Sequence, residues 1–416
     1  MNRIKSWLAL AFVYALPLAA VASDGGARWV ASWATASKSP TIFDRPLPTL
    51  DDVTLRQVVR VSLGGSRVRV WFTNESGTAP LQIGAATLAL RSSGSSVAPD
   101  SLRTLRFGGE SSVTIAPGAR VVSDPVRLRV PDRGELAISA HLPGDVSGSG
   151  SPVTYHVRAL QTNYLASGDQ TGETHLTNAL SETSWFFLAG VDVAAGPRSW
   201  GVVAVGDSIT DGDQLAFPNE PVDQNARYTD FLAERLRGRR AAVANAGISG
   251  NQATRTFLGD NLQARLARDV LAQPGATHVV ITCGINDIGL PGLLTVIGLP
   301  TPEVSAAEII AGLRQATVRA RSAGLVVVGG TLSPSGSSPL PGYSGPAVEA
   351  KRQAVNAWIR EAAAFDAVAD FDAVLRDPAD PKQLQPALSA DGLHPNSAGY
   401  RLMAEEAAAA LERTRR

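Results

Sequence analysis

Stretches far apart in the chain contain the residue types needed for acyl transfer through a serine. Ser208 follows the apolar run 202–205 in GVVAVGDSITDG, and Asp391 stands three residues before His394 in SADGLHPNSAGY. A hydroxyl becomes a nucleophile when an imidazole takes its proton, and a carboxylate can hold that imidazole in the required tautomer. Together, Ser208, His394 and Asp391 could therefore form an acyl-enzyme and hydrolyse it.

Two further stretches could stabilise the oxyanion that forms during such a reaction. NAGISGN contains Gly250, whose lack of a Cβ atom allows its backbone to approach a substrate closely, and GIND contains Asn286. We predict that the backbone N–H groups of Ser208 and Gly250 and the Asn286 amide donate hydrogen bonds to the oxyanion. Such donors lower the barrier to acyl transfer.

The C-terminal half of the chain predicts the sheet that would bring these residues together. Apolar strands alternate with amphipathic helices there, which indicates a parallel sheet covered on both faces. The carboxyl ends of parallel strands lie at one edge, where ligands bind, and the candidate residues follow such ends. We predict strands at 202–206, 241–247, 278–284, 325–330 and 367–371, and helices near 228–236, 260–272, 306–324 and 346–364 and from residue 397.

The N-terminal half, residues 28–195, has a different pattern. Short alternating segments are separated by clusters of Gly, Ser, Pro and Asp, which is typical of an antiparallel β-sandwich. We predict strands at 67–74, 81–90, 112–115, 126–130, 135–142 and 154–160.

The four chemical stretches, taken in order, resemble the SGNH/GDSL hydrolase family over residues 200–412. GDSITDG resembles the serine block of that family, NAGISGN the glycine block, GIND the asparagine block and DGLHP the Asp-x-x-His block. The resemblance implies a three-layer α/β/α, flavodoxin-like domain that hydrolyses esters. It also implies the family's roles for Ser208 as nucleophile, for Ser208, Gly250 and Asn286 as oxyanion donors, and for His394 and Asp391 as base and orienting carboxylate.

The N-terminal half carries a finer resemblance. WVASWATA, residues 29–36, and the stretches 55–77 and 154–169 are similar to secreted, xylan-acetylesterase-like members that have a β-rich domain before the hydrolase domain. This resemblance implies removal of acetyl groups from a polysaccharide. Ile209 stands where the family's nickname has leucine, which is a conservative change.

Composition and the N-terminus set further expectations. The chain has 416 residues, 38 basic and 38 acidic, so no charge excess indicates a nucleic-acid partner. Arg3 and Lys5 precede the apolar run 7–21, which ends in small residues and is typical of a cleaved signal peptide. We therefore expect a secreted or periplasmic protein without stable membrane insertion. The expected domains are a signal peptide at 1–23, a β-rich domain at 24–195 and a hydrolase domain at 196–416.

Other candidate residues have simpler interpretations. Asp207, Asp211 and Asp287 are expected to brace loops, and Cys283 is expected to be a small buried apolar residue. His156 is the remaining histidine that could line a cleft. No phosphate-binding loop, dinucleotide fingerprint or Cys/His cluster is present, so we expect neither a cofactor nor a metal.

The sequence thus predicts a serine esterase that hydrolyses short-chain esters, with an acetylated polysaccharide as the substrate. Three alternatives stay open. The apolar stretch 288–302, interpreted as a loop, could serve a lipase or lysophospholipase by walling an acyl pocket or acting as a lid. The same residues could transfer an acetyl group onto a polysaccharide. A protein that only binds glycans is the third alternative.

Overall fold

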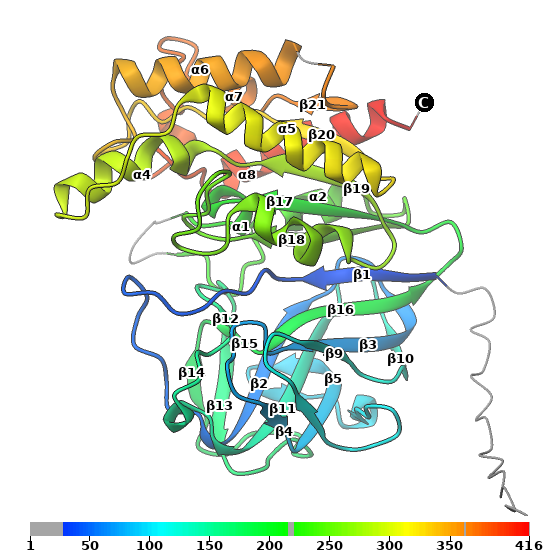
Figure 1. Ribbon diagram of the computed structural model, residues 1–416. Coiled ribbons are helices and arrows are strands. Elements are labelled where there is room, and N and C mark those ends of the chain that lie inside the picture. Colours follow the sequence, from blue (N-terminus) through cyan, green and yellow to red (C-terminus); the bar gives the residue numbers. More distant parts are fainter. Residues whose placement is uncertain (1–27, 215–219, 362, 416) are drawn as a thin grey trace, which may run out of the picture.

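The computed structural model describes residues 28–214, 220–361 and 363–415. The predicted signal peptide lies outside these residues. Within them, an antiparallel β-part is followed by an α/β-part, and the two lie against each other (Figure 1). None of the helices in the described ranges has the length and apolar character needed to cross a bilayer.

Two antiparallel sheets form most of the β-part. The first sheet contains, in order, β1 (Arg28–Ala34), β16 (Leu188–Ala195), β3 (Gly65–Thr73) and β10 (Val126–Val130), with β9 (Arg120–Val122) also paired to β3. The second contains β14 (Leu180–Glu182), β13 (Asn163–Ser167), β2 (Asp51–Arg60), β11 (Glu135–Asp145), β5 (Ala85–Ser93) and β6 (Ser96–Val97), with β7 (Arg103–Thr104) also paired to β5. Smaller pairs are β4 (Leu81–Ile83) with β8 (Val113–Ile115), and β12 (Tyr155–His156) with β15 (Trp185–Phe186).

Alternating burial explains how this part holds together. In β3 the side chains of Val68, Val70 and Phe72 are fully buried, while the residues between them are partly exposed. The predicted strand 81–90 is interrupted at Gly84. The predicted strand 154–160 was wrong beyond residue 156, because Arg158 and Leu160 adopt positive φ angles of 58° and 48° that no strand accommodates.

The α/β-part is built on a parallel sheet, as predicted. Within the described residues its five strands lie in the order β18-β17-β19-β20-β21. The second strand in sequence is therefore at the edge of the sheet, and the first lies between the second and the third. This order is that of flavodoxin-like sheets. The strands are β17 (Trp200–Gly206), β18 (Ala241–Gly247), β19 (Ala276–Thr282), β20 (Val326–Gly330) and β21 (Ala367–Ala369).

Helices cover both faces of this sheet (Figure 1), which confirms the predicted three-layer α/β/α arrangement. Side chains of α3, α5 and α6 pack on one face, and those of α2, α7 and α8 pack on the other. The helices are α1 (Ser208–Asp211), α2 (Tyr228–Arg235), α3 (Leu262–Leu266), α4 (Ile285–Val296), α5 (Ala306–Ser322), α6 (Pro346–Glu361), α7 (Phe371–Leu375) and α8 (Ser397–Arg413).

Two further segments, both in the α/β-part, differ from the sequence prediction. The apolar stretch 288–302 is not wholly a loop, because α4 continues to Val296 with Pro291 inside it. Pro291 has no N–H to donate to the Asp287 carbonyl, so the helix loses one backbone hydrogen bond there and still continues. The helical stretch predicted at 260–272 is α3 followed by a π-helical turn at Ala267–Leu271.

Polar contacts join the two parts. Strand β1 lies along the α/β-part (blue in Figure 1), and the Ala31 N–H donates to the Pro274 carbonyl at 2.8 Å. The Ser62 hydroxyl oxygen accepts from the Val243 N–H of β18 at 2.8 Å. Such an interface fixes the β-part against the sheet that carries the candidate residues.

Candidate active site

The candidate nucleophile lies just after the end of strand β17. Ser208 is the first residue of α1, and the preceding Asp207 caps that helix by accepting from the Ile209 N–H at 3.1 Å. Asp391 and His394 lie in the loop before α8, where Pro395 follows the histidine. A residue before proline avoids helical backbone angles, so this loop cannot merge into α8 at His394.

The structure brings Ser208, His394 and Asp391 into one hydrogen-bonded chain. His394 Nε2 lies 2.9 Å from Ser208 Oγ, and His394 Nδ1 lies 2.7 Å from Asp391 Oδ2. Because a carboxylate accepts, Nδ1 carries the proton and Nε2 is left to accept from the serine hydroxyl. The serine and histidine are buried, at 6% and 4% exposure.

Backbone N–H groups hold the Asp391 carboxylate in place. Asp391 Oδ1 accepts from the N–H groups of Leu393 at 3.0 Å and His394 at 2.8 Å. Burial raises the pKa of Asp391, but the hydrogen bonds and charge of His394 outweigh it, so the pKa lies below its usual value. Asp391 therefore stays ionised while it orients His394.

The three predicted oxyanion donors also lie at this edge of the sheet. Asn286 is in the first turn of α4, and its Nδ2 donates to the Asn251 carbonyl at 3.1 Å. A carbonyl only accepts, which fixes the orientation of the amide and leaves its second N–H for a ligand. The N–H groups of Ser208 and Gly250 likewise have no acceptor among the described residues.

Gly250 has a backbone that other residues rarely adopt. Its φ angle is +75°, and the side chain of Leu258 occupies the place where a Cβ would lie. A larger residue here would strain the backbone and meet Leu258. The glycine is therefore required by the geometry of the loop.

Sequence reasoning missed two side chains that orient these donors. The Tyr343 hydroxyl donates to Asn286 Oδ1 at 2.6 Å. The buried Arg265 donates to Asn251 Oδ1 at 3.0 Å and to the Gly206 carbonyl at 2.8 Å. The sequence did offer a sign that Arg265 is buried, because it stands among apolar residues of a predicted helix. Tyr343 lies in a loop, where no periodic pattern could have indicated its role.

The carboxylates predicted to brace loops do so. Asp287 accepts from the Ala253 and Thr254 N–H groups at 2.7 and 3.0 Å. Asp211 accepts from the Ser249 N–H at 3.1 Å and lies 3.0 Å from His156 Nε2. Both carboxylates thus hold the segment around Gly250.

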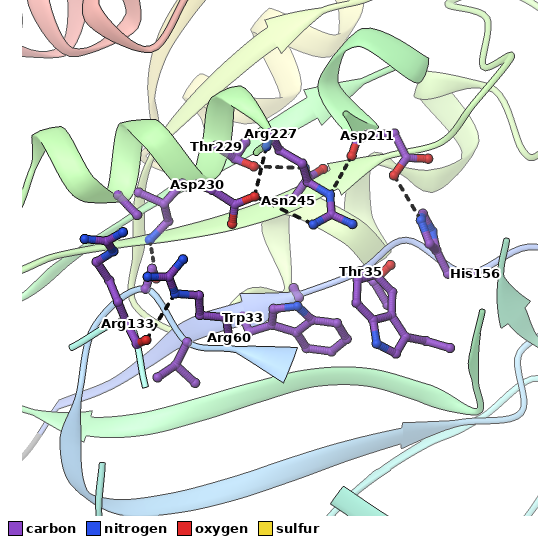
Figure 2. Close-up of a pocket in the computed structure, with 16 residues that line it drawn as sticks. Trp33, Thr35, Arg60, Arg133, His156, Asp211, Arg227, Thr229, Asp230 and Asn245 are labelled. Carbon is purple, nitrogen blue, oxygen red and sulfur yellow. Dashed lines mark hydrogen bonds and ion pairs between the residues drawn. The ribbon is translucent and has the colours of Figure 1, made fainter. Parts of the chain in front are cut away.

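A small cavity of about 40 Å³ lies at the boundary of the two parts (Figure 2). His156 lines it, as the sequence suggested, together with Trp33 and Trp185, whose rings meet edge to face at 4.9 Å. Ser208 and His394 do not line it. These tryptophans therefore pack at the boundary of the two parts rather than beside Ser208.

Two groups near the serine have pKa values raised by burial. The buried Cys283 thiol has a pKa well above its usual value, so it stays protonated and unreactive. Burial raises the pKa of Asp207 to about 7, although the Ile209 N–H opposes the shift. A raised carboxyl pKa means that ionisation costs stability as the pH rises from about 4 to 7.

Replacing Asp207 by asparagine is therefore expected to stabilise the protein at alkaline pH. The amide oxygen can still accept from the Ile209 N–H, and the buried charge is gone. We expect a gain of about 2–4 kcal/mol in the free energy of unfolding at pH 8, shrinking as the pH falls towards 4. Urea unfolding of both proteins across this pH range measures it, and a gain that does not change with pH would contradict the assignment.

Comparison with known proteins agrees with this geometry. Residues 204–402 match the GDSL-like Lipase/Acylhydrolase family. The C-terminal half of the chain is a GDSL/SGNH hydrolase domain. The protein is therefore an enzyme, a serine esterase or acylhydrolase, as its sequence predicted. An ester substrate follows from the family.

Several solved structures are similar to this chain over about half of its length. A GDSL-like lipase from Bacteroides thetaiotaomicron is 20% identical, with 51% of this chain and 87% of that chain covered and a TM-score of 0.38. A catalytic mutant of an acetylxylan esterase from Geobacillus stearothermophilus is 23% identical (52% and 94% covered, TM-score 0.38). A carbohydrate acetylesterase from Sinorhizobium meliloti is 16% identical (51% and 99% covered, TM-score 0.39). No match was found among curated proteins.

Proposed function

We propose that this GDSL hydrolase removes short acyl groups, above all acetyl, from the hydroxyls of a polysaccharide. The catalytic part of the proposal rests on two hydrogen bonds made by His394. Its Nδ1 lies 2.7 Å from Asp391 Oδ2, and its Nε2 lies 2.9 Å from Ser208 Oγ. A histidine held in this way can take the proton of a serine hydroxyl.

The reaction would proceed through an acyl-enzyme. Ser208 Oγ attacks the ester carbonyl while His394 takes the hydroxyl proton and passes it to the leaving sugar oxygen. The N–H groups of Ser208 and Gly250 and the Asn286 amide stabilise the oxyanion. A water molecule, deprotonated by His394, then attacks the acyl group and regenerates Ser208.

The surroundings of the donors favour a small acyl group. Leu258 lies against Gly250, and Tyr343 is hydrogen-bonded to Asn286, so bulky side chains stand beside both donors. The resemblance of the β-part to acetylesterase-like proteins points to the same acyl group.

A larger cavity next to the segment around Gly250 would take the sugar. It measures about 520 Å³ and is bordered by Ser249 and Leu258 on the α/β-part and by Phe43 and Arg45 on the β-part. Its charged side chains are paired, for example Lys38 with Asp44 at 2.6 Å. A cavity with paired charges and an aromatic ring suits a neutral carbohydrate better than an ion.

Hydrolysis of a nitrophenyl ester series from acetate to laurate tests the acyl specificity. We expect the highest kcat/KM for acetate, and release of acetate from acetylated xylan. Ser208→Ala measured alongside shows which turnover belongs to the site. A maximum at long chains would overturn the short-acyl proposal.

A substitution in the cavity tests the sugar site. Phe43 is 46% exposed and its ring lies 5.6 Å from that of Phe257. Phe43→Ala is expected to raise KM for acetylated xylo-oligosaccharide by more than it raises KM for nitrophenyl acetate. Ile42→Ala is the matched control, because Ile42 is 84% exposed and does not line the cavity. Equal effects of Phe43→Ala on both substrates would contradict the assignment.

Longer acyl chains form the second candidate substrate class. Val296, Ile297 and Leu299, at the end of the helix that carries Asn286, are 68%, 50% and 44% exposed. Exposed apolar side chains of this kind are what a lipid substrate would contact. The same ester series distinguishes this class from short-chain esters. Acetyl transfer is tested separately, because it would yield an acetylated glycan from an acetyl donor and a glycan.

We also propose that the enzyme is exported, because a polysaccharide substrate lies outside the cell. The basic and apolar pattern of residues 1–23 supports this proposal. N-terminal sequencing of protein recovered from periplasm and medium tests it, and recovery of uncleaved protein from the cytoplasm alone would contradict it.

A further inference from the structure

The oxyanion loop, defined here as residues 248–250, is held by two buried carboxylates. The Ser249 N–H donates to Asp211 Oδ2 at 3.1 Å, and the Ser249 hydroxyl donates to Asp213 Oδ2 at 2.6 Å. Both backbone and side chain of the residue before Gly250 are thereby fixed. The direction of the Gly250 N–H depends on this residue, since one peptide plane joins the two.

Each carboxylate also holds a basic side chain from the β-part. Asp211 Oδ1 lies 3.0 Å from His156 Nε2, and the two side chains face each other in Figure 2. Asp213 Oδ1 accepts from Arg158 Nε at 3.1 Å. Asp211, Asp213 and His156 are each at most 4% exposed. One short segment of the β-part therefore reaches the oxyanion loop through two parallel contacts.

The surroundings of His156 favour its charged form. Its Nδ1 lies 2.8 Å from the Ala36 carbonyl, so both ring nitrogens face acceptors. Burial and the nearby Arg227 lower the pKa of His156, but Asp211 and the Ala36 carbonyl outweigh them and the pKa is raised. The ring of Trp185 packs beside the imidazole. A buried imidazolium then pairs with a buried carboxylate, and the loss of either leaves the other uncompensated.

We propose that His156 and Arg158 are positioning residues of the esterase reaction, which hold the Gly250 N–H at the oxyanion through Asp211, Asp213 and Ser249. This inference rests on the proposed function. It gives the β-part a direct role in rate, in addition to the proposed sugar cavity, which Arg158 also lines. Neither residue touches the reacting atoms.

Steady-state kinetics with nitrophenyl acetate test the inference. His156→Ala is expected to lower kcat by about 10-fold or more with KM within about twofold, since a misplaced oxyanion donor acts on the transition state. Inactivation by diethyl 4-nitrophenyl phosphate, which also needs the oxyanion donors, is expected to slow by a similar factor. His156→Gln is expected to recover part of the loss, because its amide can donate to Asp211.

Arg133→Met is the matched control. Arg133 also joins the two parts, through Glu234 at 3.2 Å on α2, but it does not reach the oxyanion loop. It is expected to keep the parent values of kcat and of the inactivation rate. If Arg133→Met lost as much activity as His156→Ala, the inference would be overturned. The loss would then follow from breaking any contact between the two parts.

If His156→Ala fails to fold, the same measurements are made on Arg158→Met. Its side chain is 24% exposed, so its loss disturbs the core less. A lower melting temperature in folded variants with parent kcat and parent inactivation rate would overturn the inference. A parent enzyme without any esterase activity would instead defeat the proposed function, so the two failures are distinct.

Discussion

Ser208→Ala is expected to lower kcat/KM for nitrophenyl acetate by about 10⁴–10⁶-fold, because the acyl-enzyme can no longer form. The hydroxyl has its contact with His394 at 2.9 Å, and no other hydroxyl is hydrogen-bonded to that imidazole nitrogen among the described residues. Any residual turnover would come from the oxyanion donors and from binding alone. Steady-state assays of purified parent and variant measure the loss.

The control for this prediction is the fold of the variant. Alanine is smaller than serine and Ser208 is the first residue of a short helix, so the melting temperature is expected to stay within a few degrees of the parent value. A folded variant that retains more than a tenth of the parent kcat/KM would show that another group attacks the ester.

Gly250→Ala has the second largest expected effect, a loss of about 10²–10³-fold in kcat with a smaller change in KM. The added methyl group meets Leu258, and the φ angle of +75° is unfavourable for alanine. Either the loop moves or the backbone strains, and in both cases the N–H leaves its position. The loss falls on kcat because the oxyanion exists only during reaction.

Gly238→Ala separates backbone strain from the position of the donor. Gly238 has a φ angle of +77°, close to that of Gly250, but its Cβ would meet open space. This variant is expected to lose some stability and to keep the parent kcat. If Gly250→Ala kept its kcat as well, the assignment of its N–H to the oxyanion would be wrong.

The fold could be predicted from the sequence where buried apolar residues recur at the spacing of a helix or a strand. Continuous apolar strands and amphipathic helices predicted the parallel sheet and the helix α5, at whose start Ser305 and Glu308 form a capping box. The domain limits and the signal peptide stay predictions. The helix around Pro291 was missed because proline and glycine hide a helical pattern that tertiary packing sustains.

The candidate site was predictable in part for a similar reason. Ser208 and Asn286 follow strand ends, and parallel strands bring such ends to one edge of the sheet. The contacts that orient them were not predictable from the sequence. His156 and Asp211 are 55 residues apart, and Tyr343 and Asn286 are 57 apart, so no local spacing relates them.

Detection of the acyl-enzyme tests the central claim most directly. The parent enzyme is mixed with nitrophenyl acetate, stopped in acid within the first turnovers, digested and analysed by mass spectrometry. The account predicts an acetyl group on the peptide that contains Ser208, and none on that peptide in Ser208→Ala. Turnover without any acetylated peptide, or with the acetyl group on another residue, would contradict it.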